Sequence, residues 1–417
     1  MENISSRISG IADRYKDRFF EIFKHCHMYP EISLREYETT KYIKGIMAEL
    51  GIPEHGKQPE TGAVFLLEGG RPGPCVALRA DIDALEITEQ STCPFPSQNE
   101  GAMHACGHDV HYGGLLCAAI ILSELREEIE GSVKFIFQPG EELNMGARFL
   151  IPDGVLEDPH VEAVYGYHTY AFMKTGEVGI IHGPIMASVD DINVTVKGKG
   201  GHGGIPQMAT DPVVATAAII QGLQSIVARN VSPVDSGVVT IASVLAGGER
   251  INNIIPDEVR LRGTIRAYRE DTEYMMWDRA REICESTAKA YGCEAEVQFI
   301  HHLPVTDNMP HDGRRDLYGI ALKAAEAIGC SVSSPEPSGG GDDFSLYMKG
   351  VDGHPGTAGF YYWLGVGNEE KDCMHSWHSP RYQADPDAVP VGAKLLAVSA
   401  LLTLDELKKE REERADA

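Results

Sequence analysis

Two short segments carry the side chains most able to do chemistry. Residues 103–111 place one thiol and three imidazoles within nine positions, and residues 138–142 place two carboxylates side by side. Cysteine, histidine and carboxylate together suit a borderline divalent cation such as zinc, manganese, cobalt or nickel. A spare glutamate beside such ligands is what a metal-dependent hydrolase uses to activate water. The sequence therefore predicts a metal-dependent hydrolase.

The first segment is best explained by metal binding. Cys106 and His108 are separated only by Gly107, so one turn can direct both side chains at a single point. An isolated cysteine is usually a small buried apolar side chain, but the glycine and the neighbouring histidines favour ligation here. A Cys–His nucleophile pair is the competing chemistry, and it would leave the carboxylates without a role. His104 and His111 are interpreted as hydrogen-bonding support for the ligands.

The remaining candidates are carboxylates and late histidines. Glu141 and Glu142 could form an acidic helix start, where they complement the helix dipole. Beside a cation, two such close charges shift each other's pKa, which suits one ligand and one base. Asp83 either makes a turn or orients a metal-bound histidine. Near the C-terminus, His375 and His378 are both possible distant ligands, and their spacing does not choose between them.

The elements that must position these groups alternate between apolar strands and helices. We expect strands at Val76–Ala80, Val133–Phe137, Val161–Tyr167 and Phe360–Leu364, a helix at 109–128, and a helical pair across 11–50 interrupted by Pro30. Buried strands separated by helices predict an α/β fold, with a mixed, largely parallel sheet between helices. Asp81 and Asp83, the glutamate pair, and His168 each follow one of these strands. Because open α/β sheets bind ligands at the carboxyl ends of their strands, we expect one shared crevice.

A second kind of pattern occupies residues 187–302. Strands are expected at Ile192–Val196, Gly237–Leu245, Val259–Ala267 and Ala295–Ile300, with helices at Asp211–Ala228 and 272–291. This βαββαβ order predicts a ferredoxin-like α+β domain inserted into a catalytic domain of residues 1–186 and 303–417. Residues 198–203 match the GxGxxG pattern, but the loop continues through Pro206 and no parallel βαβ unit follows, which excludes a dinucleotide site. The alternatives are a mobile loop that presents His202 to a substrate and a plain linker.

Composition excludes several functions. The 417 residues carry a net charge of −25, which argues against nucleic acid or an anionic membrane as partner. Nine scattered cysteines without paired CxxC spacing argue against a disulfide framework. The N-terminus has no apolar signal segment, and no apolar run approaches the roughly 18 residues that span a bilayer. We expect a cytoplasmic protein.

Many motifs in order resemble one family over nearly the whole chain. They lie at residues 27–31, 79–85, 104–109, 138–142, 166–168, 201–203, 252–257, 263–266 and 340–345, and at His378. The family is that of the co-catalytic metallo-amidohydrolases and metallopeptidases, which includes bacterial hippurate hydrolases, aminoacylases and plant indole-acetyl-amino-acid hydrolases. Two positions depart from its pattern. Gly140 stands where many members have alanine, and Asp342, one methylene shorter, stands where many have glutamate.

The resemblance implies a complete site. It implies two divalent metal ions per subunit, zinc or manganese with cobalt or nickel as alternatives, held by Cys106, His108, Glu142, His168 and His378 with the thiolate shared. Glu141 would be the general base and Asp83 would support the metal ligands. The inserted domain would act as a lid and as the contact of a homodimer or higher homo-oligomer. It would bring His202, often from the partner subunit, to the scissile carbonyl, while Asn253 and Arg266 would contact the substrate.

The expected reaction is hydrolysis of a small-molecule amide, namely an N-acyl amino acid or a related conjugate. One alternative is a dipeptidase or carboxypeptidase that uses the same dinuclear site. Another is a non-catalytic metal-binding protein, against which the intact Glu141, Glu142 and His202 count.

Overall fold

The computed structural model describes residues 2–248 and 252–416. Backbone contacts divide the chain into two units, one formed by Met1–Gly183, Asp307–Glu336 and Asp343–Ala417, the other by Pro184–Thr306 and Pro337–Asp342. The short segment 337–342, which the sequence analysis assigns to the catalytic domain, clusters with the second unit. Its backbone explains this, because Ser338 N–H donates to Ile185 O at 2.9 Å and Ala187 N–H donates to Ser338 O at 3.1 Å.

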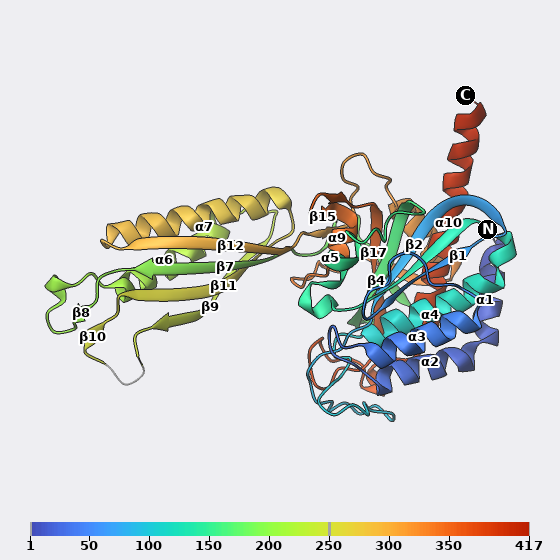
Figure 1. Ribbon diagram of the computed structural model, residues 1–417, viewed down its shortest axis with the longest axis horizontal. Coiled ribbons are helices and arrows are strands. Elements are labelled where there is room, and N and C mark those ends of the chain that lie inside the picture. Colours follow the sequence, from blue (N-terminus) through green and yellow to red (C-terminus); the bar gives the residue numbers. More distant parts are fainter. Residues whose placement is uncertain (1, 249–251, 417) are drawn as a thin grey trace. The chain divides into compact units, whose positions relative to one another are not determined.

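The first unit is built on a mixed sheet of seven strands among the described residues, in the order β1-β3-β2-β4-β17-β5-β14. Figure 1 labels β1, β2, β4 and β17 of this sheet. The strands are β1 (Ala63–Glu68), β2 (Arg71–Asp81), β3 (Glu130–Gln138), β4 (Val161–Lys174), β5 (Glu177–Gly179), β14 (Ser331–Ser333) and β17 (Ala358–Gly367). The central strands β3, β2, β4 and β17 are parallel, and β1 is antiparallel to β3. The predicted α/β sheet is therefore mixed, with a parallel centre.

Helices cover both faces of this sheet. They are α1 (Glu2–Arg14), α2 (Lys16–Met28), α3 (Tyr37–Glu49), α4 (His108–Glu124), α5 (Gly146–Leu150), α8 (Tyr318–Ala327), α9 (Phe344–Lys349) and α10 (Ala388–Asp416). Alternate residues of β17 separate the two faces. On one face Tyr362 donates or accepts a 2.8 Å hydrogen bond with Ser399 of α10. On the other, Tyr361 stacks on Phe344 of α9 with ring centroids 4.4 Å apart.

Helix α4, which carries a candidate ligand at its first residue, lies in the centre of the core. It is buried on all sides from His108 to Leu122. Gly114 allows this close packing. A Cβ atom on Gly114 would lie 1.9 Å from the hydroxyl oxygen of Tyr167 in β4. The N-terminal end of α4 is thereby held rigidly against the sheet.

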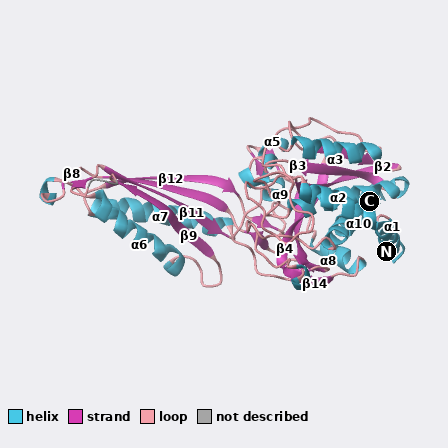
Figure 2. Cartoon of the chain, turned by 90° about the horizontal axis from the view of Figure 1, so that it is seen from below, coloured by secondary structure: helices cyan, strands magenta, loops and turns pink. Residues whose placement is uncertain are grey.

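The second unit has the βαββαβ order that the sequence predicts. Its elements are β7 (Val189–Lys197), α6 (Pro212–Arg229), β9 (Gly237–Ala246), β11 (Glu258–Ala267), α7 (Glu270–Ala290) and β12 (Glu294–Leu303). The antiparallel sheet has the order β12-β7-β11-β9. Apolar residues of β7, α6 and α7 form one core, and Figure 2 shows both helices on the same face of the sheet. Short strands complete the chain: β6 (Pro184–Met186), β8 (Gly201–His202), β10 (Ile254–Ile255), β13 (Thr306–Asp307), β15 (Gly350–Val351) and β16 (His354–Pro355).

The expectation that no segment is long and apolar enough to span a bilayer is wrong for two helices. By length and composition, α6 and residues Ala388–Arg414 of α10 both pass that test. The uninterrupted apolar runs in these helices are short, but their mean hydropathy is high because it tolerates scattered polar residues. Burial accounts for α10, because 67% of its most apolar window is buried in the core of the first unit. Helix α6 is buried along one face, through Ala215, Ile219, Leu223 and Ile226.

Candidate metal centre and substrate-binding residues

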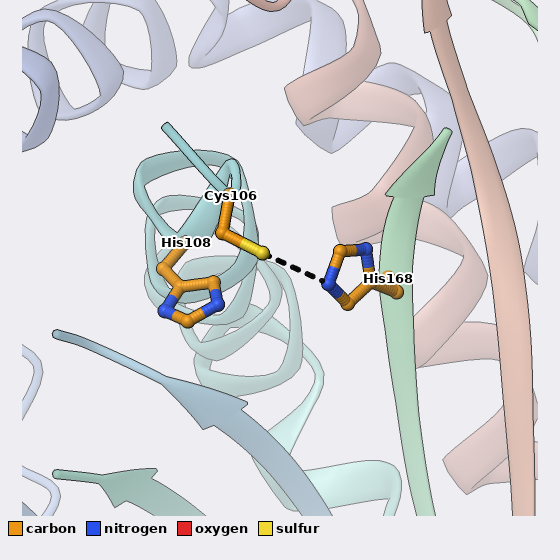
Figure 3. Close-up of side chains that lie close together, drawn as sticks. All are labelled: Cys106, His108 and His168. Carbon is orange, nitrogen blue, oxygen red and sulfur yellow. Dashed lines mark hydrogen bonds between the residues drawn. The ribbon is translucent and has the colours of Figure 1, made fainter. Parts of the chain in front are cut away.

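A left-handed turn brings Cys106 and His108 to the same side. Gly107, between them, has φ 92°, and a Cβ atom there would lie 2.4 Å from the Thr169 and Tyr382 hydroxyl oxygens. Only glycine fits this conformation and this space. Figure 3 shows the result, in which the Cys106 side chain points toward His168. The Sγ atom of Cys106 lies 3.4 Å from Nε2 of His168.

His168 presents its Nε2 atom as a lone-pair donor. Its Nδ1 atom donates a 2.9 Å hydrogen bond to the Thr169 carbonyl oxygen, which leaves Nε2 free of a proton and directed at the thiol. Burial, with the nearby His111, holds the pKa of His168 well below its usual value, so the ring is neutral. A neutral imidazole with its second nitrogen fixed by a carbonyl is the form that binds metal ions.

One predicted feature of His168 is wrong. It does not follow the end of its strand, because β4 continues to Lys174. The reason is unequal pairing on the two sides. The ladder between β4 and β2 ends at Tyr165, whereas the ladder between β4 and β17 pairs His168 with Trp363 and continues beyond it. His168 therefore lies beyond the last residue of β4 that pairs with β2, so this edge of β4 is open to the ligands of α4.

His108 and the glutamate pair face one another through unpartnered atoms. The Nδ1 atom of His108 donates to the Asp83 carbonyl oxygen at 2.9 Å. Its Nε2 atom is buried without a hydrogen-bond partner and lies 3.9 Å from both Glu141 Oε2 and Glu142 Oε1. Glu142 Oε1 is likewise buried and unpartnered. Buried lone pairs left without donors are costly unless a cation binds them, so these atoms fit a metal ion.

His378 completes the cluster. Its Nε2 atom lies 3.6 Å from Glu142 Oε2, and its backbone N–H donates to the Ala105 carbonyl oxygen at 2.9 Å. His375, which the sequence could not distinguish from it, is instead 3.1 Å from Asp372. The donor atoms form three overlapping sets, each within 4.8 Å: Cys106, His108 and His168; Cys106, Glu142 and His378; His108, Glu141 and Glu142. Because Cys106, His108 and Glu142 each belong to two sets, the arrangement suits two neighbouring ions.

Asp83 holds two members of this cluster in place. Its Oδ2 atom accepts hydrogen bonds from the Ser33 hydroxyl at 2.6 Å and from the Glu142 N–H at 3.0 Å. Its Oδ1 atom lies 3.3 Å from His108 Nδ1. Asp83 thus orients both a histidine and a glutamate, as expected of a carboxylate behind metal ligands.

The electrostatics of the cluster favour a cation. Burial raises the pKa of Glu142 to about 7, and the nearby Asp83 adds to that rise. Burial alone would lower the pKa of His108, but the carboxylates of Asp81, Asp83 and Glu142 raise it to about 10. The carboxylates thus concentrate negative charge around the ligand atoms, and a divalent cation would balance it.

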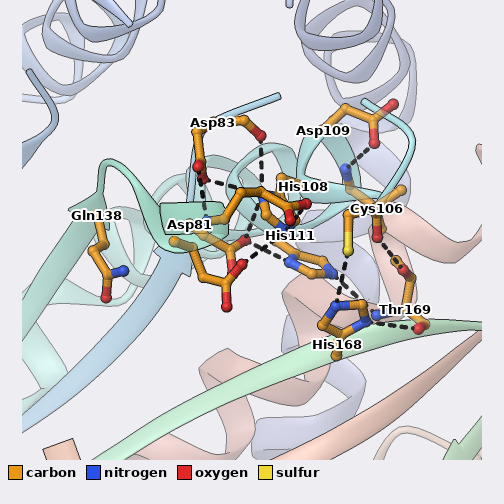
Figure 4. Close-up of polar contacts among 12 residues, drawn as sticks. Asp81, Asp83, Cys106, His108, Asp109, His111, Gln138, His168 and Thr169 are labelled. Carbon is orange, nitrogen blue, oxygen red and sulfur yellow. Dashed lines mark hydrogen bonds and ion pairs between the residues drawn. The ribbon is translucent and has the colours of Figure 1, made fainter. Parts of the chain in front are cut away.

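A buried network that the sequence does not reveal lies behind the cluster. Arg79 donates to Asp81 at 2.8 Å, to Asp343 at 2.6 Å and to Gln138 at 3.0 Å. Asp81 in turn accepts a 2.6 Å hydrogen bond from His111, as Figure 4 shows. An arginine inside an apolar strand signals a buried ion pair, but the sequence does not name the partner.

The two supporting histidines behave differently. His111 uses both ring nitrogens, since Nδ1 donates to Asp81 and Nε2 accepts from the Thr169 N–H at 3.0 Å. It is the satisfied hydrogen-bonding group that the sequence analysis expects. The supporting role expected of His104 is wrong, because both of its ring nitrogens are buried without a hydrogen-bond partner. It packs against Tyr112, and burial lowers its pKa to about 4.

The second unit separates the three substrate-binding candidates into two places. His202 in β8 pairs with Ile254 in β10, and Gly203 N–H donates to the Asn253 carbonyl oxygen at 2.7 Å. His202 and Asn253 are therefore neighbours, and both are exposed. His202 Nδ1 accepts from Gly204 N–H at 3.0 Å, so the proton of its neutral ring is on the exposed Nε2 atom.

Arg266 lies at the other end of that unit. Its neighbour in β11, Ile265, pairs with Asp190, so Arg266 lies beside the start of β7. His202 is in β8, which comes after Lys197, the last residue of β7. A strand of this length spans about 25 Å. The side chain is half-buried, and burial lowers the pKa of Arg266. Within one chain, therefore, Arg266 does not meet His202 and Asn253.

Comparisons with known proteins agree with this geometry. Residues 77–401 match the profile described as peptidase family M20/M25/M40. N-acetylcysteine deacetylase of Bacillus subtilis is 37% identical over 404 residues, covering 95% of this chain and 100% of the deacetylase. Thermostable carboxypeptidase 1 of Saccharolobus solfataricus is 35% identical, covering 96% of this chain and 98% of its own. IAA-amino acid hydrolase ILR1-like 4 of Arabidopsis thaliana is 34% identical, with coverages of 98% and 91%.

Among solved structures, a Bacillus subtilis protein described as a dinuclear metal binding peptidase from the M20 family has a TM-score of 0.81. It is 34% identical, and the match covers 94% of this chain and 99% of that one.

Proposed function

The chain belongs to peptidase family M20/M25/M40, and from that membership we propose that it hydrolyses the amide bond of a small N-acyl amino acid. Relatives that are similar over nearly their whole length are named as a deacetylase of N-acetylcysteine and as a hydrolase of IAA-amino acids. Both names describe removal of an acyl group from an amino acid. The observation that carries the proposal is the cluster of Cys106, His108, His168, Glu142 and His378 around unpartnered lone pairs.

Five side chains would hold two divalent ions: Cys106, His108, Glu142, His168 and His378. The mixture of one thiolate, three imidazoles and a carboxylate suits zinc or manganese, and it accommodates cobalt or nickel. When bound, such ions polarise a carbonyl group and lower the pKa of water toward neutrality. The solved relative described as dinuclear supports the count of two ions.

Glu141 is the proton carrier in this proposal. It lies beside the ligands, 3.9 Å from His108 Nε2, and is 6% exposed. A carboxylate in that position takes the proton of the attacking water and returns it to the nitrogen of the leaving amine. Asp83 fixes the carboxylate next in sequence by accepting the Glu142 N–H, so it positions the glutamate pair.

The second unit would supply the substrate contacts. His202 offers an exposed Nε2–H to the oxygen on which charge develops, beside the amide of Asn253. Arg266 would bind the carboxylate of the amino acid. Because Arg266 and His202 lie at opposite ends of β7, one small substrate reaches both only when two copies of the chain contribute. We therefore propose a homodimer in which the second unit serves as lid and contact.

The exposed edge of the second unit suits that assembly. Strand β9 is at the edge of its sheet, and Val238, Val244 and Leu245 on it are 42%, 48% and 59% exposed. We also propose a reducing, cytoplasmic location, since all nine cysteines are free thiols.

The test is replacement of Glu141 by alanine and by glutamine. Both variants are expected to keep their metal and to lose roughly 10²- to 10⁴-fold in turnover, the usual contribution of a general base. Turnover is measured as amine release from N-acetyl and N-benzoyl amino acids, and metal content by mass spectrometry. Glu157→Ala, on an exposed loop, is the matched control. Near-wild-type turnover in Glu141→Ala would exclude this role.

A peptidase is the second candidate, and the similarity to a carboxypeptidase favours it. The same site would cleave a dipeptide or the last residue of a longer peptide. Dipeptides and blocked peptides in the same substrate panel separate the two activities. Cleavage confined to peptides would establish the peptidase. Silence across the panel despite bound metal would point to a binding protein.

A further inference from the structure

A second group of metal-type donor atoms lies in the first unit and shares no residue with the five ligands proposed above. The donor atoms of His27, Glu89 and Cys93 all lie within 4.8 Å of one another. His27 is in the last turn of α2, and the other two are in the loop that precedes α4. His27 Nε2 lies 3.3 Å from Glu89 Oε1, and their side chains are 3% and 5% exposed. A nitrogen, an oxygen and a sulfur therefore converge, with the His27 and Glu89 side chains buried and Cys93 partly exposed.

The imidazole of His27 has the orientation of a metal ligand. Its Nδ1 atom donates a 2.7 Å hydrogen bond to Asp109 Oδ2, so its Nε2 atom is turned toward Glu89 and Cys93. Asp109 is itself held, because its Oδ1 atom accepts from the Val110 N–H at 3.0 Å. A carboxylate behind the ring nitrogen that does not bind the ion is the usual support of a metal-bound histidine.

A cavity gives access to the cluster. It has a volume of about 530 Å³, and its lining includes His27 and Cys93, the rings of Phe20 and Phe95, and Cys373. Phe95 closes one side, with its ring edge-on to His27 at 5.8 Å between centroids. Three protein ligands with one position open to a cavity are typical of zinc sites that take water or a small ligand.

The local field also attracts positive charge. Burial alone would lower the pKa of His27, but its contacts with Asp109, Cys93 and Glu89 raise that pKa well above its usual value. Asp109 beside Nδ1 and Glu89 beside Nε2 both favour positive charge at this ring. Thiolate and carboxylate would neutralise a divalent ion, and the Nε2 and thiol protons would pass to solvent on binding.

We propose that His27, Glu89 and Cys93 form a third metal site, which takes a zinc ion and leaves one coordination position facing the cavity. This site is separate from the dinuclear cluster and its existence does not depend on the proposed reaction. A thiolate, an imidazole and a carboxylate select zinc or cobalt over magnesium or calcium.

The experiment compares metal content in the full-length protein. Wild type and Cys93→Ser are equilibrated with excess zinc, passed through a desalting column and analysed by mass spectrometry. Wild type is expected to retain one zinc ion per chain more than Cys93→Ser. Cys373→Ser is the matched control, because Cys373 lines the same cavity outside the cluster, and it is expected to equal wild type. Equal zinc content in wild type and Cys93→Ser would overturn the proposal.

A second measurement needs no substitution. Two samples of wild type are compared, one loaded with two zinc equivalents and one with excess zinc. Each is treated with iodoacetamide, and the rate of Cys93 alkylation is followed by peptide mass spectrometry. The excess is expected to slow alkylation of Cys93 about tenfold, because a thiolate held by a metal is a poor nucleophile. An unchanged rate would refute the site, even if the serine variant failed to fold.

Discussion

The carboxylate of Asp343 is the most sensitive point of the buried network behind the glutamate pair. It is fully buried and accepts from Arg79 at 2.6 Å, from Gln138 at 2.8 Å and from Ala147 N–H at 3.1 Å. Asp343→Ala removes one of the two carboxylates that balance Arg79 and leaves two amide donors short of an acceptor. Breaking a buried ion pair costs about 3–5 kcal/mol. Arg79 keeps Asp81, so we expect a loss of about 4 kcal/mol.

That loss is measurable as a thermal shift. At roughly 2–4 °C per kcal/mol for a domain of this size, Tm should fall by roughly 8–16 °C in Asp343→Ala. Asp343→Asn keeps one acceptor and should fall by about half as much. Asp387→Ala is the control, since it breaks an exposed pair with Lys371 that is worth about 0–1 kcal/mol. Differential scanning fluorimetry gives all three values. A Tm for Asp343→Ala within about 3 °C of wild type would refute the reasoning.

Three further predictions test packing, metal binding and charge. Gly114→Ala should cost about 1–3 kcal/mol, because its Cβ would lie 1.9 Å from the Tyr167 hydroxyl oxygen, and Tyr167→Phe should relieve part of that loss in a double-mutant cycle measured by urea unfolding. Chelation of the metal should lower Tm, because an ion whose free concentration is 100 times its Kd stabilises the folded state by about 2.7 kcal/mol. Added zinc or manganese should restore Tm. An unchanged Tm after chelation would contradict a metal site. Burial alone would lower the pKa of His301, but Asp190 and Glu273 raise it to about 9 from 6.5. Its stabilising effect is therefore complete below pH 6.5 and lost as pH rises through about 9, so the difference in urea midpoint between wild type and His301→Asn should shrink over that range.

Local patterns were sufficient to predict much of the first unit's site. Short apolar runs that end in polar residues identified β2 and β3, and the spacing of Cys106, Gly107 and His108 predicted the turn that directs two ligands together. These features depend on residues that are close together in the chain, so they can be predicted from a single sequence. The βαββαβ order of the second unit was predicted in the same way, from alternation within each element.

Features that depend on distant partners could not be predicted. The length of β4 is set by β17, almost two hundred positions later, and this is why His168 was wrongly placed after the strand. The choice of His378 over His375 depends on a backbone bond to Ala105. Arg79 and Asp343 are 264 positions apart, and the residues around each do not indicate that the other is its partner.

The position of β17 has a consequence for synthesis on the ribosome. This strand pairs with both β4 and β5, yet it emerges only after the whole second unit has been made. At about 5–20 residues per second, β4 waits roughly 10–40 s for its neighbour. During that time its open edge and the apolar α4 have no permanent cover, which favours pairing with other chains. The second unit, whose elements are contiguous, can fold in that interval. Production of the enzyme should therefore depend on chaperones that bind the first 183 residues while the remainder is being translated.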